Sequence, residues 1–547
     1  MRVLVVIPAR GGSKGIPRKN LRKLGQKPLI SYAIQNASQT SYDCDVFVSS
    51  DDDEILYMAD QLGAFCHNRS KELAEDQTTL DPVIYSTYLY AKRERGIEYD
   101  LIVTLQPTSP LLESSSLEKA LNQIHSNLEI DTIISAVEDT HLSWLKVDGQ
   151  FIPNYEKRLN RQELTPSYKE TGGFLITRSS VISENNRIGE NVSLYPLSGK
   201  ESIDIDTFED WNVCEYYLRR KQLLFVVTGN NKVGLGHVYN TLILANEILN
   251  HDVSFLVDKE SKLAFDKINE SNYPVLFQRS EDIFDDIVQI DPDVVINDRL
   301  DTSFNYISKL KNSGFQVVNI EDLGEGAQLA DIVINAIYPE KRKRLNHYYG
   351  PSYFCAREEF LLLPEKEVSQ NLEKVLITFG GVDPSNLTKK ILEAIYEVCK
   401  SRGIEITVVL GLGYEELSSL SKFEDVEIKK DIKNIAFEMY QADLCFSSAG
   451  RTTYELALVG TPSIILAQNQ RELTHFFADE ANGFVSLGLG SDAAIEEIRS
   501  SFIHLIENKE ERLFMHNKMK DNNIKNGKNK VVNLIKNLIE NEDRASI

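Results

Sequence analysis

Short apolar runs alternate with longer segments of helical spacing along the first 220 residues. Each apolar run is too short for a helix and is rich in β-branched residues, which is typical of a buried strand. The segments between the runs, such as residues 29–37 and 54–62, have the apolar spacing of an amphipathic helix. The alternation predicts an α/β fold with a mainly parallel sheet. The predicted strands are residues 3–7, 46–49, 101–105, 132–137 and 174–177.

A second set of predicted strands and helices begins near residue 220. Residues 210–222 have helical spacing and lead directly into an apolar strand at 223–227, without a Pro- or Ser-rich linker. Two further α/β patterns follow, with glycine turns after their strands, and they predict two facing lobes. Residues 501–547 carry Leu and Ile at helical spacing, which indicates terminal helices. The predicted domains are residues 1–220, 221–370 and 371–547.

The composition limits the class of protein. The 547 residues, 42% hydrophobic and 26% charged, are ordinary for a globular protein of about three units. With 60 basic and 82 acidic residues the formal charge is −22, which argues against a nucleic-acid or anionic-membrane surface. We find neither a signal peptide nor a run of the ~18 apolar residues that span a bilayer. The scattered cysteines indicate reduced core thiols of a cytoplasmic protein, at positions 44, 66, 214, 355, 399 and 445.

A glycine-rich basic loop follows the first predicted strand. Residues 7–20 contain three glycines and four cations, namely Arg10, Lys14, Arg18 and Lys19. Glycines let backbone N–H groups turn towards a phosphate, and the cations neutralise its charge. The spacing matches neither a Walker A loop nor a dinucleotide fingerprint. A basic surface turn is the alternative, but open α/β sheets bind ligands at this end of a strand, which favours a nucleoside triphosphate.

The string Ala-Arg-Gly-Gly-Ser-Lys-Gly-Ile-Pro-x-Lys-Asn in this loop resembles the CTP-binding loop of the CMP-sialic acid synthetase (acylneuraminate cytidylyltransferase) family. The likeness continues through about the first 215 residues. The resemblance implies a nucleotide-diphospho-sugar transferase fold, which is glycosyltransferase-A-like, and the transfer of CMP from CTP to a sialic-like acid. It also implies that the triphosphate is held by Arg10, Ser13, Lys14 and Lys19, of which Arg10 and Lys19 act in catalysis.

Two further motifs of that family follow predicted strands. Asp51 comes after the second strand, where the resemblance implies a substrate contact. The acids at 52–54 are instead typical of a solvated helix N-terminus, which the helix dipole favours. Gln106 begins Gln-Pro-Thr-Ser-Pro-Leu, at which the family contacts the acceptor sugar. A merely rigid strand-to-helix turn is the alternative at this position.

Residues 139–168 lose their periodicity and gather aromatic residues and arginines. A loosely packed insertion is one interpretation. In the resembled family this region is an arm that crosses to a second subunit, and the resemblance therefore predicts a homodimer. It makes Arg161 and Gln162 candidates for binding the sugar carboxylate, which a guanidinium fork matches bidentately.

Asp204 and Asp206 lie in the string Ser-Ile-Asp-Ile-Asp. On a strand, positions i and i+2 share one face, and two carboxylates there would repel each other without a cation between them. Mg²⁺ bound by one or two carboxylates and substrate phosphates fits this pattern, and an edge strand with solvated acids is the alternative. The family string matches letter for letter and implies that both aspartates are Mg²⁺ ligands. One of them, for which we choose Asp206, also polarises the attacking hydroxyl.

The second half opens with a strand and a glycine-rich loop that ends at His237. A histidine at a helix N-terminus meets the positive end of the helix dipole, which disfavours the imidazolium form. Such a neutral imidazole can serve as a general base at pH 7. A helix cap is the alternative role for His237.

The order of the motifs from residue 223 to 490 resembles the glycosyltransferase-B-fold UDP-sugar hydrolase of pseudaminic acid biosynthesis. The resemblance implies that His237 activates water for attack on the anomeric carbon of a UDP-linked diacetamido-trideoxy-sugar. Asn240 departs from the arginine that the family often has there. The resemblance also implies that UDP and sugar are held by the C-terminal lobe, including Glu455, Asn469 and Gln470. Independently of the resemblance, exposed backbone amides at the glycine turns Gly380–Gly381 and Ala449–Gly450 would meet a diphosphate.

Together the two halves predict a bifunctional enzyme of nonulosonic acid biosynthesis. Its substrates would be CTP, a sialic-like acid (pseudaminic, legionaminic or N-acetylneuraminic) and a UDP-sugar. Two alternatives remain for the second half: a glycosyltransferase, or a non-catalytic domain that binds a nucleotide-sugar and regulates the first half. Turnover of UDP-sugar with water alone would separate the first alternative from a hydrolase, and UDP binding without turnover would favour the second.

Overall fold

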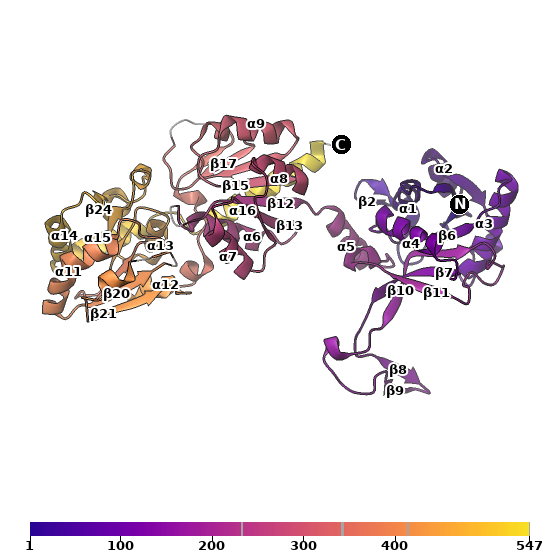
Figure 1. Ribbon diagram of the computed structural model, residues 1–547, viewed down its shortest axis with the longest axis horizontal. Helices are drawn as coiled ribbons and strands as arrows, with labels where there is room; N and C mark the ends of the chain where they lie inside the picture. Colours follow the sequence, from indigo (N-terminus) through magenta and orange to yellow (C-terminus); the bar gives the residue numbers. More distant parts are fainter. Residues whose placement is uncertain (231–232, 341–343, 412, 415, 431, 546–547) are drawn as a thin grey trace. The chain divides into compact units, whose positions relative to one another are not determined.

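The computed structural model describes residues 1–230, 233–340, 344–411, 413–414, 416–430 and 432–545. Its first strand, β1 (Arg2–Pro8), lies inside a seven-stranded sheet (Figure 1). The chain forms two compact units, Met1–Arg220 and Lys221–Ile547. Among the described residues no helix is both long and apolar enough to cross a membrane.

The sheet of the first unit has the strand order β11-β7-β10-β6-β1-β4-β5. Only β10 runs antiparallel to its neighbours, so the prediction of a mainly parallel sheet is confirmed. The strands are β4 (Asp43–Ser50), β5 (Phe65–Asn68), β6 (Leu101–Leu105), β7 (Thr132–Glu138), β10 (Tyr168–Arg178) and β11 (Val192–Pro196), beside a short pair, β2 (Lys23–Leu24) and β3 (Lys27–Pro28). The helices are α1 (Leu29–Ser38), α2 (Asp53–Gln61), α3 (Leu80–Arg95), α4 (Ser114–Ser126) and α5 (Phe208–Leu218).

The predicted arm is a β-hairpin that projects from the end of β7 and β10 (Figure 1). Its strands β8 (Trp144–Val147) and β9 (Gln150–Pro153) pair with each other and with no other strand of the described chain. All eight of their residues are exposed, whereas β1 and β6 at the centre of the main sheet are almost entirely buried. A two-stranded hairpin is marginally stable alone, because it has no sheet face to pack on.

The second unit has two lobes, each built on a parallel sheet. In the first lobe the strand order is β14-β13-β12-β15-β16-β17-β18, and in the second it is β21-β20-β19-β22-β23-β24. The first lobe contains β12 (Gln222–Val227), β13 (Asp252–Val257), β14 (Val275–Phe277), β15 (Val294–Asp298), β16 (Gln316–Ile320), β17 (Ile332–Asn335), β18 (His347–Tyr349), α6 (Gly236–Glu247), α7 (Lys262–Glu270), α8 (Ile283–Ile290), α9 (Phe304–Asn312) and α10 (Glu358–Leu361). The second lobe contains β19 (Lys374–Thr378), β20 (Glu405–Leu410), β21 (Val426–Lys430), β22 (Leu444–Ser447), β23 (Ser463–Ala467), β24 (Phe484–Leu489), α11 (Leu387–Arg402), α12 (Ile435–Gln441), α13 (Thr452–Val459), α14 (Ile495–Glu507) and α15 (Lys509–Lys520).

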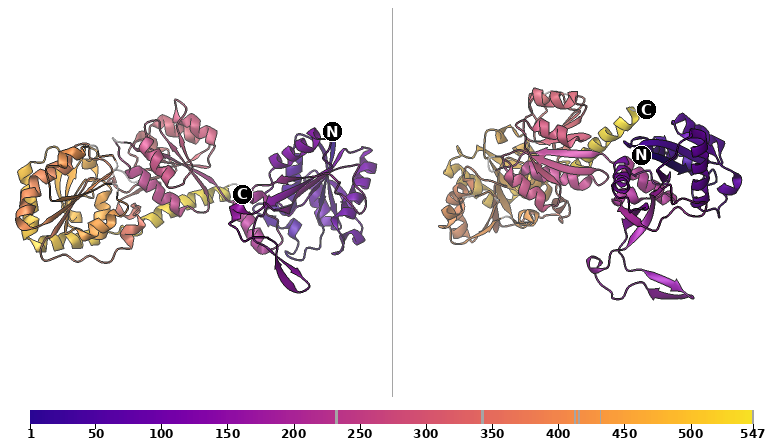
Figure 2. Two further views of the ribbon diagram at one scale, coloured as in Figure 1. Left: turned by 60° about the horizontal axis from the view of Figure 1, so that its bottom comes forward. Right: turned by 45° about the vertical axis from the view of Figure 1, so that its right-hand side comes forward.

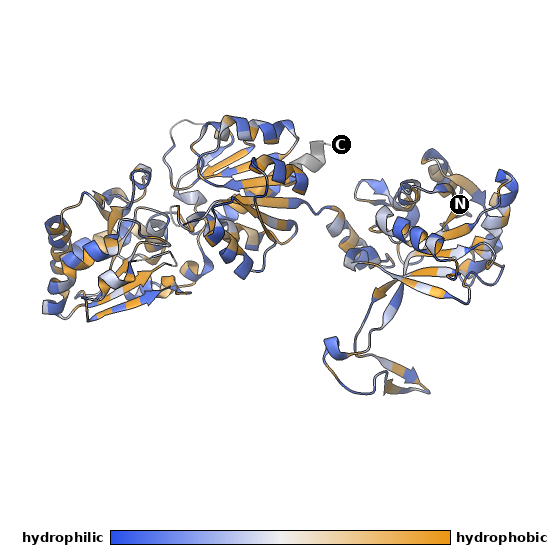
Figure 3. Cartoon of the chain, in the orientation of Figure 1, coloured by the Kyte–Doolittle hydropathy of each residue, from blue (hydrophilic) through white to orange (hydrophobic). Residues whose placement is uncertain are grey.

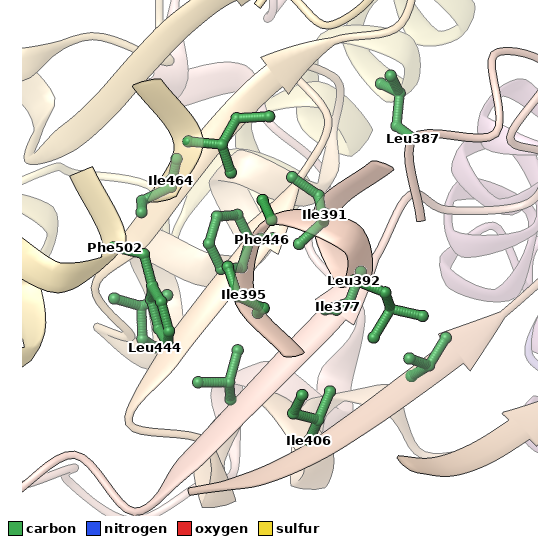
Figure 4. Close-up of a cluster of buried hydrophobic side chains, with 14 of the residues drawn as sticks. Ile377, Leu387, Ile391, Leu392, Ile395, Ile406, Leu444, Phe446, Ile464 and Phe502 are labelled. Atoms are coloured by element: carbon green, nitrogen blue, oxygen red, sulfur yellow. The ribbon is translucent and has the colours of Figure 1, made fainter. Parts of the chain in front are cut away.

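The hydrophobic strands of each sheet lie between amphipathic helices, as their colours in Figure 3 show. In the second lobe, Ile377 of β19 and Phe446 of β22 pack with Ile391 and Ile395 of α11 and Phe502 of α14 (Figure 4). Each buried side chain of this size contributes about 1.5–3 kcal/mol by leaving water. Burial on both faces explains why the strands were recognisable as continuous apolar runs.

The last helix, α16 (Gly527–Ala545, yellow in Figure 2), belongs with the first lobe rather than with the second. Its Val531, Val532 and Ile535 join the core formed by β12 and α6. Our sequence analysis had assigned residues 371–547 to one lobe, so the packing of α16 corrects that assignment. The apolar spacing of the helix was evident, but not the lobe against which it packs.

A shared apolar cluster joins the two lobes of the second unit. Phe354 of the first lobe stacks on Tyr454 of α13 with ring centroids 4.5 Å apart, and Tyr454 stacks in turn on Phe477 at 4.0 Å. The hydroxyl of Tyr454 donates to the carbonyl oxygen of Ala336, 2.9 Å away. The predicted α/β fold class is thus confirmed: an α/β first unit is followed by a second unit of two α/β lobes.

Candidate active sites

The first unit has a cavity of about 410 Å³ at the carboxyl ends of β1 and β6. The loop after β1 forms one wall, and the segments between β5 and α3 and before α5 form others. Parallel strands end at one edge of a sheet, which brings residues distant in sequence together there. Six of the predicted site residues line this cavity: Arg10, Ser13, Lys14, Lys19, Gln106 and Asp206.

Asp76 holds two of the loop cations. Arg10 Nη1 donates to one Asp76 oxygen at 2.8 Å, and Lys14 Nζ lies 2.6 Å from the other. Bonding to Lys14 and Arg10 lowers the pKa of the Asp76 carboxyl, which therefore stays ionised at neutral pH. Sequence analysis did not single out Asp76. A bound triphosphate would compete with this carboxylate for the same two cations.

Lys19 connects the basic loop with the segment of the two aspartates. Its Nζ donates to the carbonyl oxygen of Ile205 at 2.5 Å and lies 3.6 Å from Asp206 Oδ1. Gly15 packs so closely here that a Cβ atom would lie 2.3 Å from the Asp206 carbonyl oxygen. Only glycine fits such an approach, so the two segments meet because of this residue.

Asp204 and Asp206 do not lie on a strand, which corrects the predicted secondary structure. They follow a 3₁₀ turn (Gly199–Ser202) in an extended segment that leads to α5. The extended backbone still alternates its side chains, because Ile205 is fully buried between the two partly or fully exposed acids. The amide of Ile205 donates to the carbonyl oxygen of Thr108 at 2.8 Å, which fixes the segment beside the loop after β6.

The Asp204 carboxyl is partly buried and incompletely hydrogen-bonded. Its Oδ1 is buried and has no hydrogen-bond partner among the described residues. Burial, and to a lesser extent the neighbouring Asp206, raises the pKa of Asp204, while Thr108 and Lys19 lower it. A Cβ atom on Gly172 would lie 2.8 Å from Asp204 Oδ1, so this glycine leaves the carboxylate room. An unpartnered buried carboxylate oxygen next to a second carboxylate fits a divalent cation.

Asp51 lies beneath the basic loop instead of lining the cavity. Its Oδ1 accepts a hydrogen bond from the Gly11 amide at 3.2 Å and lies 3.6 Å from Arg69 Nη2. Arg69 does line the cavity, although its side chain is almost fully buried. Sequence analysis missed Arg69 because no glycine or paired charge marks its position. Asp52 caps α2 by accepting from the Glu54 amide, which confirms a helix N-terminus at residues 52–54.

Arg161 and Gln162 are exposed and lie in a 3₁₀ turn of the arm, Arg161–Glu163. They do not line the cavity of their own chain. Asn160 and Glu163 cap the turn reciprocally, which orders the arginine's backbone within an otherwise uncovered segment.

The second unit has two adjoining cavities between its lobes, of about 170 and 460 Å³. We call them the small and the large cavity. Six residues line both, and they come from the start of α6, the loop after β19 and the start of α13: Leu235, Gly236, Gly380, Gly381, Arg451 and Thr452. Backbone amides after β19, a helix N-terminus and an arginine form a place for an anionic group at this junction.

His237 lines the large cavity and is paired with a buried carboxylate. Its Nδ1 lies 2.5 Å from Oδ1 of Asp298, the last residue of β15, which is fully buried. Because a carboxylate accepts, Nδ1 carries the hydrogen, and in the neutral form of the ring Nε2 has the lone pair. The cap of α6 is Leu235, and no side chain caps that helix, so the alternative role of His237 as a cap is excluded. Nothing local in the sequence indicates that β12 and β15 are neighbours, so the sequence alone could not place Asp298 beside His237.

Asn240 links this pair to the opposite lobe. Its amide nitrogen donates to Asp298 Oδ2 at 2.8 Å, and its Oδ1 accepts from Arg451 Nη2 at 2.8 Å. Arg451 also lies 3.7 Å from Glu321 and over the ring of Phe354. Asn240 stands where the resembled family often has an arginine. In this structure the guanidinium of Arg451, from the second lobe, lies next to it. Burial raises the pKa of Glu321, another residue of the large cavity, to about 7.

The remaining predicted contacts are divided between the cavities. Glu455 lines the small cavity and accepts two hydrogen bonds from Arg357, at 3.1 and 2.9 Å. Gly450 and Asn469 line the large one. Ala449 lines neither, because Glu472 and His475 engage its backbone, and Gln470 is exposed and also lines neither. The structure therefore does not bring Ala449 and Gln470 to the cavity walls.

Comparison with known proteins agrees with the geometry of the first unit. A cytidylyltransferase family model matches residues 4–206. The CMP-N,N'-diacetyllegionaminic acid synthase of Legionella pneumophila is 34% identical over 232 residues, which are 41% of this chain and 98% of that protein. An uncharacterized protein of Methanocaldococcus jannaschii is 31% identical over 324 residues, or 51% of this chain. The chain spans only 66% of the length of that archaeal relative.

One relative extends over both units. A Helicobacter pylori protein is 22% identical over 530 residues, which are 92% of this chain and 95% of that protein. It is described as a pseudaminic acid cytidylyltransferase and UDP-2,4-diacetamido-2,4,6-trideoxy-beta-L-altropyranose hydrolase. The Legionella relative is more than 30% identical and is matched over nearly its whole length, and the family model matches the same part of this chain. These two matches identify the family. The chain belongs to the cytidylyltransferase family.

Proposed function

We propose that the first unit transfers CMP from CTP to a nonulosonic acid and releases pyrophosphate. The observation that carries this proposal is the single cavity that Arg10, Lys14 and Lys19 share with Gln106 and Asp206. The cations suit the triphosphate, and Asp206 suits a metal-assisted transfer. The Legionella relative, named for a CMP-sugar acid synthase, supports the choice of acceptor.

The chemistry follows from the arrangement of the chain's own groups. Arg10 and Lys14 release the Asp76 carboxylate and bind the triphosphate in its place. Together with Lys19 they offset the negative charge that develops on pyrophosphate. The anomeric hydroxyl of the sugar acid attacks the α-phosphorus, its proton passes to Asp206, and the bond to pyrophosphate breaks. Gln106 lines the same cavity and would contact the sugar. Positioning and electrostatics supply most of the catalysis in such transfers.

We propose Mg²⁺ as the cation that completes this site. The orphaned Oδ1 of Asp204 and the neighbouring Asp206 are hard oxygen donors of the kind that Mg²⁺ prefers. When bound, the ion would withdraw charge from the phosphate oxygens. Asp204 and Asp206 would hold it, and Lys19 would contact phosphate.

The Asp204→Asn variant tests the cation site by thermal stability, without an enzyme assay. Because burial raises the pKa of Asp204, its ionised form destabilises the metal-free protein at pH 7, and this cost disappears as the pH falls through the raised pKa. We expect the variant to melt at a higher temperature than the wild type in EDTA. We also expect it to gain less from added Mg²⁺ and CTP. Scanning calorimetry measures both effects.

Asp206→Asn is the matched control, because the side chain of Asp206 is largely exposed. Its melting temperature in EDTA should equal that of the wild type. An Asp204→Asn variant that is less stable in EDTA, yet fully stabilised by Mg²⁺ and CTP, would contradict the site.

The transferase proposal itself is tested by pyrophosphate release. The wild-type protein is incubated with CTP, Mg²⁺ and pseudaminic, legionaminic or N-acetylneuraminic acid in turn. We expect release with at least one acid and none without acid. Pyrophosphate release that is independent of every acid, or absent with all three, would overturn the proposal.

We propose that the second unit hydrolyses a UDP-linked sugar. The two adjoining cavities suggest how such a ligand lies: the nucleoside in the small cavity, the diphosphate at Gly380, Gly381 and Arg451, and the sugar beside His237. The Helicobacter relative, whose name includes a UDP-sugar hydrolase, supports this choice. The His237–Asp298 pair favours hydrolysis over simple binding, because a positioned base serves a reaction.

In this proposal His237 Nε2 takes a proton from water. The resulting oxygen nucleophile attacks the anomeric carbon, and the bond between that carbon and the UDP oxygen breaks. UDP leaves as an anion, whose charge Arg451 and the amides at Gly380 and Gly381 offset. Asp298 holds the imidazole in the tautomer that leaves Nε2 unprotonated, and Asn240 holds Asp298.

Replacement of His237 by Gln tests the base. We expect UDP release from the UDP-sugar to fall by roughly 100- to 10,000-fold, because general-base catalysis of that size is lost. Affinity for UDP itself should change by less than about threefold, since the nucleoside binds elsewhere. Asp298→Asn should also slow release, but retain more activity than His237→Gln.

His504→Gln on the exposed face of α14 is the control, and it should behave as the wild type. Near-normal UDP release by His237→Gln would refute the catalytic role. Turnover that requires an acceptor other than water would instead identify a glycosyltransferase.

We also propose that the arm forms a homodimer. Trp144 and Phe151 are 54% and 70% exposed on a hairpin that packs on no other sheet, and such a surface gains stability when a partner covers it. The exposed Arg161 would then reach the cavity of the partner subunit. In the wild type this predicts twice the 62.0 kDa chain mass by light scattering.

The Trp144→Ser, Phe151→Ser double variant should have the monomer mass and reduced CMP transfer. Tyr57→Ser, which alters an exposed aromatic residue of α2, should remain a dimer. Arg161→Ala should lose transfer but keep the dimer mass. A fully active monomeric wild type would reject the arm's role.

A further inference from the structure

His475 is a second histidine of the large cavity, and nothing in the proposed hydrolysis uses it. It follows a 3₁₀ turn of the second lobe, Glu472–Thr474, whereas His237 belongs to the first lobe. Both side chains line the large cavity, and neither lines the small one. A ligand in the large cavity therefore has an imidazole from each lobe beside it.

The hydrogen bonding of His475 fixes its tautomer. Nδ1 lies 2.7 Å from the carbonyl oxygen of Ala449. A carbonyl oxygen can only accept, so Nδ1 carries the hydrogen. In the neutral ring, Nε2 must then be an acceptor. Burial lowers the pKa of His475 to about 4, with smaller contributions from Arg471 and Arg451, and the ring is therefore neutral at pH 7.

The second nitrogen has no partner. His475 Nε2 is buried and, within the described part of the chain, accepts no hydrogen bond. Buried polar atoms almost always have a partner, since an unmade hydrogen bond costs about 1–3 kcal/mol. This exception occurs at the wall of a cavity, which suggests that a ligand supplies the missing donor.

Neighbouring contacts hold the ring in one orientation. The Tyr338 ring meets His475 edge to face, with centroids 5.0 Å apart. The Tyr338 hydroxyl accepts from Arg471 Nε at 2.6 Å, and Arg471 makes two further bonds to Asp301, at 3.1 and 2.9 Å. A lone pair fixed in this way discriminates between ligands better than one on a mobile side chain.

We propose that His475 is a specificity-determining residue whose Nε2 accepts a hydrogen bond from an N–H or O–H donor on the glycosyl group of the UDP-sugar. This inference rests on the proposed function of the second unit and assigns the donor to the sugar, because His475 lines only the large cavity. Ile337 and Phe379 line the same cavity and offer apolar contact beside the acceptor. An acetamido group, with an N–H and a methyl, or a sugar hydroxyl can supply the donor.

His475 is not a second general base in this account. A base of pKa near 4 binds a proton too weakly at neutral pH to assist the attack of water effectively. A neutral acceptor, by contrast, contributes equally throughout the neutral range. Its effect should therefore appear in sugar binding rather than in nucleotide binding.

Calorimetric titration with UDP, UDP-N-acetylglucosamine and UDP-glucose tests the proposal on the full-length protein. His475→Phe keeps a planar ring but removes the acceptor, and His475→Gln places a carbonyl oxygen near the position of Nε2. For His475→Phe we expect about tenfold weaker binding of at least one UDP-sugar, the size of one lost hydrogen bond, and UDP binding within about twofold of the wild type. His475→Gln should recover most of the loss.

The two sugars distinguish the donors. A loss confined to UDP-N-acetylglucosamine identifies the acetamido N–H, and an equal loss for both identifies a hydroxyl. Unchanged affinity of His475→Phe for both UDP-sugars, or an equal loss of UDP and UDP-sugar affinity, would overturn the assignment. A wild type that binds UDP-sugars without hydrolysing them would refute the hydrolase alone, whereas one that binds no UDP-sugar would refute both.

Discussion

The functional groups of this protein gather where parallel strands end. In the first unit the basic loop follows β1, Asp51 follows β4 and Gln106 follows β6. The second unit repeats the arrangement, with Asp298 at the end of β15 and Gly380 just beyond β19. Carboxyl ends of parallel strands meet at one edge, and the loops that leave them need no regular structure of their own. Three sheets therefore produce two sites from residues that are far apart in sequence.

Some of the charged side chains at these sheet edges are buried, and the cost of burial is offset to a different extent for each carboxylate. Asp298 is fully buried, but both of its oxygens are bonded, to His237 and to Asn240. Asp204 keeps one buried oxygen without a hydrogen-bond partner among the described residues, which makes its ionised carboxylate costly. Buried carboxylates without a full set of partners destabilise the folded state, so they indicate where a ligand completes the structure.

Two kinds of contact join the lobes of the second unit. The stack of Phe354, Tyr454 and Phe477 joins them by apolar packing, and the contact between Arg451 and Asn240 joins them by a hydrogen bond beside His237. A change in the separation of the lobes would alter the surroundings of His237 and His475 together. The cleft is thus built on a packed core rather than on a flexible linker.

Sequence analysis could predict the elements whose signal is local. The apolar runs at residues 3–7 and 101–105 became β1 and β6, because strands buried on both faces are continuously apolar. It could not predict the ion pairs of Asp76 with Arg10 and Lys14, or the hydrogen bond between Arg451 and Asn240. Those contacts join segments that are distant along the chain. It assigned a strand to residues 203–206, where an alternating pattern also fits an extended segment pinned to Thr108.

The central claim is that one chain carries two separate nucleotide sites with different chemistries. Asp206→Asn, assayed in parallel for CMP transfer and for UDP release, tests it most directly. The substitution removes an exposed charge beside Lys19 and changes almost no volume. We expect that Asp206→Asn nearly abolishes CTP-dependent transfer and that added Mg²⁺ restores it only in part. UDP release by the same variant should be unchanged. Retained transfer would contradict the role of Asp206, and a parallel fall in UDP release would contradict the independence of the two sites.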